Sequence, residues 1–334
     1  MKKLVYLLLF VLCITLVSCG EDKPREDTKD ADYVVGILQY LTHDALDDAT
    51  KGFKDTLEQK LKEQGKTVKF VYKNPEQDET MLTSMAAQLV QECDLVLGNA
   101  TPAATALKSA AKRQGKDLPI LFTSVTDPVS VSLVESLDKP NTNSTGTSDM
   151  NPVEAQIDLI FEVKPETKKI GFLYTSTETN SIVQCDMAKE YLKKNKGFTD
   201  DMMLTRAFNQ ASDIAASVTY LVNNGVDCIY LPTDNTVASS ISTITKITNP
   251  NGVFLLAGEG AMIKNGATFS YSINYYSLGQ ITGQMAFEIL NGADIKTMAV
   301  RSQTTDFEFS YNEEALEALN LNLSEEFKNK HNIK

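Results

Sequence analysis

The stretch Tyr33-Val-Val-Gly-Ile-Leu-Gln39 decides the fold, because it has the composition of a strand that is buried on both faces. Strands of this kind are typical of parallel sheets covered by helices on each side. The residues that follow fit such a helix, since apolar side chains recur every four residues on one face between Asp44 and Gln64. Together the two segments predict one βα unit.

Similar units repeat along the chain and fall into two sets. Short apolar runs alternate with amphipathic stretches, which is typical of parallel sheets with crossover helices. A long helix is expected to begin at Asn151-Pro152, and Lys169-Ile-Gly-Phe-Leu-Tyr174 then resembles the opening strand. The sequence therefore predicts two similar α/β halves, each with a Rossmann-like parallel sheet. The expected strands are 33–39, 67–72, 94–98, 119–124, 144–148, 169–174, 202–208, 226–231, 253–257 and 268–273. The expected helices are 44–64, 78–91, one that starts with Thr101 as N-cap and Pro102 as first residue, 181–195, 213–223 and 235–247.

The end of the chain is expected to return to the first half. Tyr276–Leu290 has the pattern of a helix, and Arg301–Ser310 alternates like a strand. Multiple crossings between two lobes make a hinge, so the lobes could close on a ligand. The expected divisions are a first lobe of 33–150 with about 276–310, a second lobe of 151–275, and a helical tail of 311–334.

The N-terminus has the pattern of a lipoprotein signal. Two lysines precede an apolar run from Leu4 to Val17, which is shorter than the roughly 20 residues that a membrane span needs. A serine then precedes Cys19, and the whole pattern resembles a bacterial lipobox, whose cysteine becomes the lipidated N-terminus. We expect a signal peptide over 1–18 and an acidic, flexible tether over 19–32. An ordinary signal peptide or an uncleaved membrane helix is the alternative.

The composition argues against several functions. The formal net charge is −12 at pH 7 and basic residues are interleaved with acidic ones, so we expect no nucleic-acid partner. His43 and His331 are the only histidines, which argues against a histidine-cysteine metal site and a catalytic triad. Outside the signal the cysteines are the scattered Cys93, Cys185 and Cys228. Cys93 and Cys228 each lie beside an apolar strand-like run and are expected as buried apolar residues, with one disulfide as the alternative.

Polar side chains gather where the expected strands end, which is where open parallel sheets bind ligands. Helix N-termini at Thr101 and Ser181 could hold a small carboxylate through free amide groups. An aromatic wall is available from Tyr40 and Tyr174. The residues that could hold an ammonium group are Asp127, Asp149, Asp234, Asn235 and Glu259. These side chains together predict a site for a zwitterion with an apolar or aromatic side chain.

Most of these candidates also have a purely structural interpretation. Asp127 before Pro128 could simply turn the chain, and His43 is expected at a helix entry rather than as a catalytic base. Gln39 is harder to explain structurally, because it ends an otherwise buried strand. The residues that could equally cap helices are Thr101, Asp149, Ser181 and Asn235.

Several short motifs in one order resemble the family of ABC-transporter substrate-binding lipoproteins whose characterised members bind tryptophan or tyrosine. The resemblance covers Val34 to about Leu290. The motifs are Val35-Gly-Ile-Leu-Gln39, His43-Asp-Ala-Leu-Asp47, Ala100-Thr-Pro-Ala-Ala104, Phe122-Thr-Ser-Val-Thr-Asp-Pro128, Thr145-Gly-Thr-Ser-Asp149 and Leu231-Pro-Thr-Asp-Asn-Thr236. Family members often have paired glutamates after the late strand, where this chain has Glu259 alone.

The resemblance implies the periplasmic-binding-protein type I fold, in which two Rossmann-like lobes joined by three crossings capture a ligand in their cleft. The pocket positions that it implies are Gln39, Tyr40, Thr101, Thr126, Asp127, Ser148, Asp149, Asn180, Ser181, Thr233, Asp234 and Asn235, with Glu259 and Asn274 in addition.

These observations predict a monomeric, lipid-anchored receptor in the bacterial cell envelope, on the periplasmic or the cell-surface side. It would capture an amino acid, tryptophan or tyrosine, by lobe closure and present it to the permease and ATPase subunits of an ABC importer. We expect no cofactor and no enzymatic activity. The alternatives are a ligand sensor or surface adhesin on the same scaffold, a binding protein for a nucleoside or sugar, or an enzyme.

Overall fold

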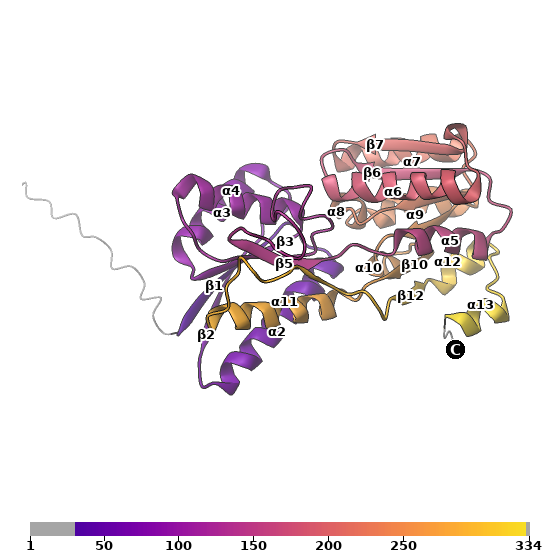
Figure 1. The fold of residues 1–334 in the computed structure, drawn as a ribbon. Coiled ribbons are helices and arrows are strands. Elements are labelled where there is room, and N and C mark those ends of the chain that lie inside the picture. The colour runs from indigo at the N-terminus through magenta and orange to yellow at the C-terminus, as the bar shows by residue number, and fades with distance from the viewer. Residues whose placement is uncertain (1–30, 332–334) are drawn as a thin grey trace, which may run out of the picture.

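A computed structural model describes residues 31–331, which form two α/β lobes joined by a hinge (Figure 1). The expected signal peptide, Cys19, all but the end of the tether and the last residues of the tail lie outside the described residues. Within 31–331, no helix has both the length and the apolar character needed to cross a membrane.

Lobe 1 is a parallel sheet with helices on both faces. Its six strands lie in the order β11-β5-β4-β3-β1-β2. One apolar cluster lies beneath α3 and α4 and another beneath α2 and α11, so the sheet is buried on both sides. The strands are β1 (Tyr33–Gln39), β2 (Val68–Lys73), β3 (Leu95–Asn99), β4 (Ile120–Thr123), β5 (Ser144–Ser148) and β11 (Arg301–Ser302). The helices are α2 (Asp44–Glu63), α3 (Glu79–Glu92), α4 (Thr101–Gln114) and α11 (Tyr275–Leu290).

Lobe 2 repeats this architecture with the strand order β12-β10-β9-β8-β6-β7. Its strands run parallel except that β12 pairs antiparallel with β10. Apolar clusters again cover both faces of the sheet. The strands are β6 (Ile170–Thr175), β7 (Met203–Phe208), β8 (Cys228–Leu231), β9 (Phe254–Ala257), β10 (Phe269–Ser272) and β12 (Glu308–Tyr311). The helices are α5 (Val153–Val163), α6 (Thr179–Lys196), α7 (Ile214–Asn223), α8 (Asn235–Ala238), α9 (Ile241–Thr248), α10 (Ala261–Lys264), α12 (Glu313–Ala318) and α13 (Glu325–Lys330).

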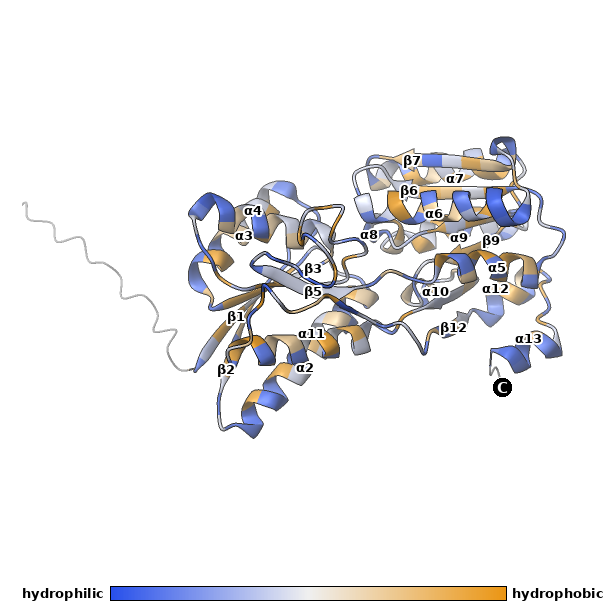
Figure 2. Ribbon diagram, viewed as in Figure 1, coloured by the Kyte–Doolittle hydropathy of each residue, from blue (hydrophilic) through white to orange (hydrophobic). Residues whose placement is uncertain are grey.

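The helices of both lobes alternate between apolar and hydrophilic stretches (Figure 2). This pattern is expected of helices that cover a sheet with one face and meet solvent with the other. The prediction of two α/β lobes with parallel sheets is therefore confirmed.

The chain crosses between the lobes at 149–152, at 273–274 and at 303–307. Hydrogen bonds tie these crossings to one another. The side-chain oxygen of Asn151 accepts from the backbone amide of Ile273 at 3.0 Å, and that of Gln303 accepts from the amide of Asn274 at 3.1 Å. The three crossings therefore form one connected hinge.

After the second crossing, α11 returns to lobe 1 and lies directly against α2 (Figure 1). Glycines allow the two backbones to touch. A β-carbon at Gly279 would lie 2.0 Å from the carbonyl oxygen of Ala49, and one at Gly52 would lie 2.1 Å from that of Tyr276. Such distances are far inside van der Waals contact, so this packing requires glycine at both positions.

The end of the chain differs from the prediction. In place of one strand over Arg301–Ser310 in lobe 1, Arg301–Ser302 pairs with β5 of lobe 1 and Glu308–Tyr311 pairs with β10 of lobe 2. The reason is the apolar surface of lobe 2, against which Phe309 and Phe327 pack with their ring centroids 5.1 Å apart. The tail thus belongs to lobe 2, and the segment before it makes the third crossing.

Two local predictions are also corrected. Ala100, with φ +87°, is the N-cap of α4, and Thr101 is the first helical residue. The expected helix 235–247 is divided into α8 and α9 at Ser239 and Ser240.

The cysteines of the described residues are free thiols, so the alternative of a disulfide among Cys93, Cys185 and Cys228 is not realised. Cys228 is buried as expected, whereas Cys93 is only partly buried.

Candidate functional site

A cavity of about 700 Å³ lies between the lobes, where the carboxyl ends of both parallel sheets meet. Lobe 1 contributes residues that include Tyr40, Leu82, Thr101 and Pro102, and lobe 2 contributes residues that include Thr175, Glu178, Asn180 and Thr236. The lining is mixed, with hydroxyl, amide and carboxylate groups beside a few apolar side chains. A ligand in a cavity built from both lobes makes its full set of contacts only while the lobes are closed.

On the lobe 1 side, the N-terminus of α4 faces the cavity with Thr101 and Pro102. Ala100 cannot cap this helix with its side chain, and no acidic residue lies in the first turn. The first amide groups and their partial positive charge are therefore free for an anion. The side chain of Thr101 is 7% exposed, and its hydroxyl has no hydrogen-bond partner.

On the lobe 2 side, Glu178 precedes α6 at the cavity wall, and its side chain makes no capping hydrogen bond to that helix. One carboxylate oxygen accepts from the backbone and side-chain amides of Asn235, at 3.0 and 2.6 Å. The other accepts from the backbone amide and hydroxyl of Thr236, both at 3.2 Å. These donors hold the carboxylate in one orientation at the wall.

Asp234 lies behind Glu178, within lobe 2. Its carboxylate accepts from the amide of Thr175 at 2.7 Å, from the hydroxyl of Thr175 at 2.8 Å, and from the amide of Val237 at 2.9 Å, as the N-cap of α8. It holds the end of β6 to the start of α8. Asp234 does not line the cavity.

Asp149 lies in the first crossing and links it to the second. Its carboxylate accepts from the hydroxyl of Thr126 at 2.9 Å and from the hydroxyl of Tyr275 at 2.8 Å. Thr126 also meets lobe 2, because Gln184 reaches it at 3.5 Å. Asp149 is therefore part of the hinge.

Four carboxyl groups are thus buried close to the cleft, and none has a lysine or arginine partner among residues 31–331. Burial raises the pKa of Asp149 and of Asp234. Burial, with the charge of Asp234, raises the pKa of Glu178 to about 7. Burial, with the charge of Asp149, raises the pKa of Glu259 to about 8. A cleft of this kind favours a positively charged ligand group.

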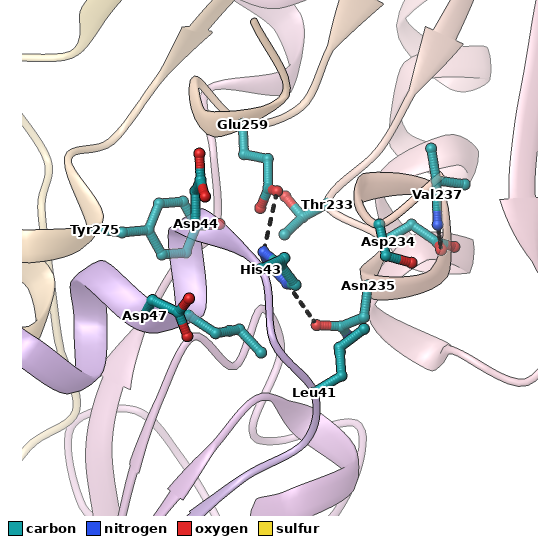
Figure 3. Close-up of polar contacts among 12 residues, drawn as sticks. Leu41, His43, Asp44, Asp47, Thr233, Asp234, Asn235, Val237, Glu259 and Tyr275 are labelled. Atoms are coloured by element: carbon teal, nitrogen blue, oxygen red, sulfur yellow. Dashed lines mark hydrogen bonds and ion pairs between the residues drawn. The ribbon is translucent and has the colours of Figure 1, made fainter. Parts of the chain in front are cut away.

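His43 enters the cleft from the N-terminus of α2 and lies between two residues of lobe 2 (Figure 3). Its Nε2 is 3.3 Å from Oδ1 of Asn235, and its Nδ1 is 3.8 Å from Oε1 of Glu259. Burial lowers the pKa of the imidazole. His43 thus makes a direct contact between the two lobes.

The predicted site residues fall into three groups. Tyr40, Thr101 and Asn180 line the cavity. A second group is buried around it, within hydrogen-bond networks of the cleft and hinge: Thr126, Ser148, Asp149, Ser181, Thr233, Asp234, Asn235 and Glu259.

The third group has partners elsewhere and does not line the cavity. Gln39 bonds within lobe 1 to Asp47 and Thr50. Asp127 accepts from the amides of its own turn. The ring of Tyr174 lies under the ammonium group of Lys189, so the expected second aromatic wall is absent from the cavity lining.

The remaining member of this third group is Asn274, which caps α11 in the second crossing. Two residues that sequence reasoning left out are central instead, Glu178 and Tyr275. His43 is at the helix entry, as expected, and in addition contacts Asn235 and Glu259 across the cleft. Glu178 had a usable signal, because it is an acidic residue between a buried strand and a helix, at a carboxyl end of the sheet. His43 and Tyr275 had no such signal in the sequence, since their importance comes from packing between the lobes.

Within 31–331, no group of three or more acidic, histidine or cysteine side chains is arranged to hold a metal ion.

Two hinged α/β lobes that enclose a polar cavity define the class of two-lobed ligand-binding proteins. The chain belongs to the ABC transporter substrate-binding protein family, whose model matches residues 34–332. It is accordingly a binding protein of ABC-transporter type and not an enzyme. Substrate-binding proteins of ABC transporters work outside the cytoplasm.

Among curated relatives, a tyrosine-binding protein from Clostridioides difficile (strain R20291) is 33% identical over 305 residues, or 91% of this chain and 85% of the relative. The crystal structure of an ABC domain in complex with L-Trp from Streptococcus pneumonia is 35% identical, with a TM-score of 0.82, and the match covers 90% and 98% of the two chains.

A ligand-free, open structure of a substrate-binding protein with adhesive properties from Clostridium difficile is 34% identical, with a TM-score of 0.66 over 88% and 96% of the chains. The fold is therefore the periplasmic-binding-protein type I fold, as the resemblance implied.

Proposed function

We propose that this protein is the lipid-anchored receptor of an ABC importer and that it binds an amino acid, tryptophan or tyrosine, between its lobes. The observation that carries this proposal is the charge pattern of the cavity. One wall is an uncapped helix N-terminus without acidic residues, and the opposite wall is the carboxylate of Glu178. A zwitterion bridges these two walls with its carboxylate toward α4 and its ammonium toward Glu178.

The hydroxyl of Thr101 would bind the carboxylate together with the first amides of α4. It is covered in the ligand-free cavity, and threonine in a helix has two favourable χ1 rotamers, so a rotation turns it toward a ligand. The ammonium group would replace the positive charge that the buried carboxylates lack. The carboxylate end of the ligand thereby contacts lobe 1, and its ammonium end contacts lobe 2.

An aromatic side chain suits the remaining space. Tyr40 and Pro102 offer flat apolar surfaces, and about 700 Å³ is ample for an indole or phenol ring. The relatives support this choice, because one is named for tyrosine binding and another was solved with L-Trp.

Lobe closure is the mechanism that this arrangement supports. At similar sequence identity, the TM-score to the L-Trp complex is 0.82 and that to the open, ligand-free structure is 0.66. The lobes of this chain are arranged more like the complex. A ligand that touches both lobes binds the closed form better and shifts the population toward it. A permease that distinguishes closed from open lobes could then select the loaded receptor.

Anchoring through Cys19 would keep this receptor beside its permease as a monomer and raise its effective concentration there. The lipobox-like sequence supports the anchor. Mass spectrometry of the protein purified from its native membrane should find a lipidated Cys19 at the N-terminus, and Cys19→Ala should release the protein from the membrane. An unmodified, membrane-free wild-type protein would contradict the anchor.

The ligand is tested by thermal shift against an amino-acid panel, followed by calorimetry. We expect L-tryptophan or L-tyrosine to stabilise the protein. Stabilisation by a nucleoside or sugar and by no amino acid would remove the proposed ligand class.

Glu178→Gln then tests the binding orientation. Loss of a hydrogen bond to a charged group costs about 1.5–3 kcal/mol, so binding should weaken by about 10- to 150-fold. Glu79→Gln is the matched control, because Glu79 lines the same cavity but is exposed at its outer end. Equal affinities of the two variants would show that Glu178 does not bind the ammonium group.

A second candidate function is surface adhesion, because the open relative is described as having adhesive properties. Deleting the gene separates the two functions. Loss of amino-acid uptake with unchanged cell attachment supports import, whereas loss of attachment alone supports adhesion.

A further inference from the structure

His43 and Glu259 face each other across the cleft, and the hydrogen bonds around them determine which atoms carry hydrogens. The orientation of the Asn235 side-chain amide fixes the first of these, the hydrogen of His43. The side-chain amide group of Asn235 donates to Glu178 at 2.6 Å, so its Nδ2 faces Glu178 and its Oδ1 faces His43. An oxygen must accept its hydrogen bond, so Nε2 of His43 carries a hydrogen. In a neutral imidazole the other ring nitrogen, Nδ1, is then a bare acceptor.

This bare nitrogen faces the carboxyl group of Glu259 from across the cleft (Figure 3). The two atoms, Nδ1 and Oε1, are 3.8 Å apart, both are buried, and neither has a hydrogen-bond partner. The side chains are 8% and 2% exposed. Two buried acceptors that face each other at 3.8 Å are unfavourable, and a single proton on either one converts the pair into a hydrogen bond.

Burial decides which residue carries that proton. The titratable groups that act on Glu259 are Asp149 in the first crossing, Tyr275 on α11, Glu178 before α6 and Asp234 before α8, besides His43 itself. The acidic groups among these and burial raise the pKa of Glu259 to about 8.

His43 is acted on by Asp44 and Asp47 of α2, yet burial lowers its pKa. The proton therefore resides on Glu259, and its hydroxyl donates to His43. Rotation of the flexible glutamate side chain closes the remaining distance.

We infer that His43 of lobe 1 and Glu259 of lobe 2 share one proton across the closed cleft, so that closing the lobes takes up a proton from solvent. In the open protein both side chains meet water, and at neutral pH the carboxylate is ionised and the imidazole mostly neutral. Closure transfers a proton from solvent to this pair, and opening returns it. The inference rests on the lobe closure of the proposed function and adds a regulator to it.

The number of protons taken up on closure follows from the pKa of His43 in the open protein and the pKa of Glu259 in the closed protein. With an open-state imidazole pKa of 6.5 and a closed-state carboxyl pKa of about 8, closure takes up about 0.7 of a proton between pH 7 and 7.5. The same values make this contribution to ligand affinity about tenfold larger at pH 6 than at pH 8. The pair of His43 and Glu259 would thus favour ligand binding more in acid than in alkali. Protonation of Glu178, whose pKa is about 7, would act in the opposite direction on the contact with the ammonium group.

Glu259→Gln tests the inference directly, because the glutamine amide can donate to Nδ1 of His43 without any titratable proton. Calorimetry with L-tryptophan or L-tyrosine, in buffers of different ionisation enthalpy, measures the protons taken up on binding. We expect the variant to take up about 0.7 fewer protons than the wild type near neutral pH and to lose the tenfold pH dependence, with affinity at acid pH retained. Glu178 titrates in both proteins, so the difference isolates the pair.

Lys264→Gln is the matched control. It breaks another pair between the lobes, Lys264 with Asp44 at 3.8 Å, whose side chains are 66% and 45% exposed. This variant should take up as many protons as the wild type. Ligand binding with equal proton uptake in wild type and Glu259→Gln would overturn the inference.

Histidine NMR gives a second measurement, made on the ligand-saturated protein. The chain has two histidines, so His43→Gln assigns both rings, with His331 as the internal reference. We expect His43 to stay neutral in the closed, ligand-bound protein, with its hydrogen on Nε2, as the pH is lowered through 6.5. A ring that becomes protonated near its ordinary pKa in that state would overturn the inference. If neither amino acid binds, the proposed ligand fails, and the same titration with whichever compound of the thermal-shift panel stabilises the protein decides on the shared proton.

Discussion

Replacing Thr101 with valine should change ligand affinity and stability in opposite directions. The side chain of Thr101 lies at the start of α4, is 7% exposed, and has a hydroxyl without a hydrogen-bond partner. Valine keeps the branched shape and removes only the hydroxyl. In the ligand-free protein the substitution breaks no hydrogen bond and removes a polar group that folding strips of water. We expect the free energy of unfolding to rise by up to about 1 kcal/mol.

Ligand binding should weaken in the same variant. A hydroxyl that donates to a ligand carboxylate makes a hydrogen bond to a charged group, which contributes about 1.5–3 kcal/mol. Its loss corresponds to an increase in Kd of about 10- to 150-fold. Calorimetry with L-tryptophan or L-tyrosine measures the affinity, and chemical denaturation of the ligand-free protein measures the stability.

Thr105→Val is the matched control for this experiment. Thr105 lines the same cavity, but its hydroxyl donates to the carbonyl oxygens of Thr101 and Pro102 at 3.0 and 2.9 Å. We expect little change in its ligand affinity. An unchanged Kd for Thr101→Val, or a lower stability of that variant, would refute the reasoning, because the hydroxyl would then either not meet the ligand or already have a partner.

Three further predictions concern stability. Gly279→Ala places a β-carbon 2.0 Å from the carbonyl oxygen of Ala49, so separating α2 from α11 should cost about 3 kcal/mol, measured by calorimetric unfolding; a wild-type midpoint would show that the helices separate freely. Phe327→Ala removes the ring of a residue that is 5% exposed, so the free energy of unfolding should fall by about 3–5 kcal/mol. Ligand affinity should stay unchanged, and weaker binding would instead link the tail to the cleft. Burial and the charge of Asp234, both within lobe 2, raise the pKa of Glu178 to about 7, so the folded protein binds more protons than the unfolded chain between pH 4.5 and 7. The melting temperature without ligand should therefore fall as the pH rises from 5 to 7, and a rise would contradict this.

The sequence predicted which segments are strands buried on both faces. It did not predict toward which face of the sheet each side chain points. Tyr33–Gln39 has no polar side chain before Gln39, which indicates a covered parallel strand but gives no alternation from which to tell its two faces. Tyr174 shows the cost of this ambiguity. It ends a strand correctly located by its composition, yet its ring packs against Lys189 of α6 and not into the cavity.

The candidate site was predictable at the level of strand ends and less so at the level of side chains. Thr101 and Asn180 lie at the cavity because every carboxyl end of a parallel sheet faces the same edge. The amide group of Gln39 is held within lobe 1 by two residues of the next helix, because its oxygen accepts from the hydroxyl of Thr50 and its nitrogen donates to the carboxylate of Asp47. Only tertiary packing reveals these contacts. His43 gains its partners from a lobe that begins more than a hundred residues later.

The glycine contact between α2 and α11 couples the hinge to the cleft mechanically. Tyr275 begins α11 directly after the second crossing and bonds to Asp149 of the first at 2.8 Å. Because Gly52 and Gly279 bring the two helix backbones together, we expect α2 and α11 to move as one rigid unit. The N-terminus of α11 lies at the hinge and the N-terminus of α2 follows His43. A rotation at the hinge is therefore expected to move His43 in the cleft.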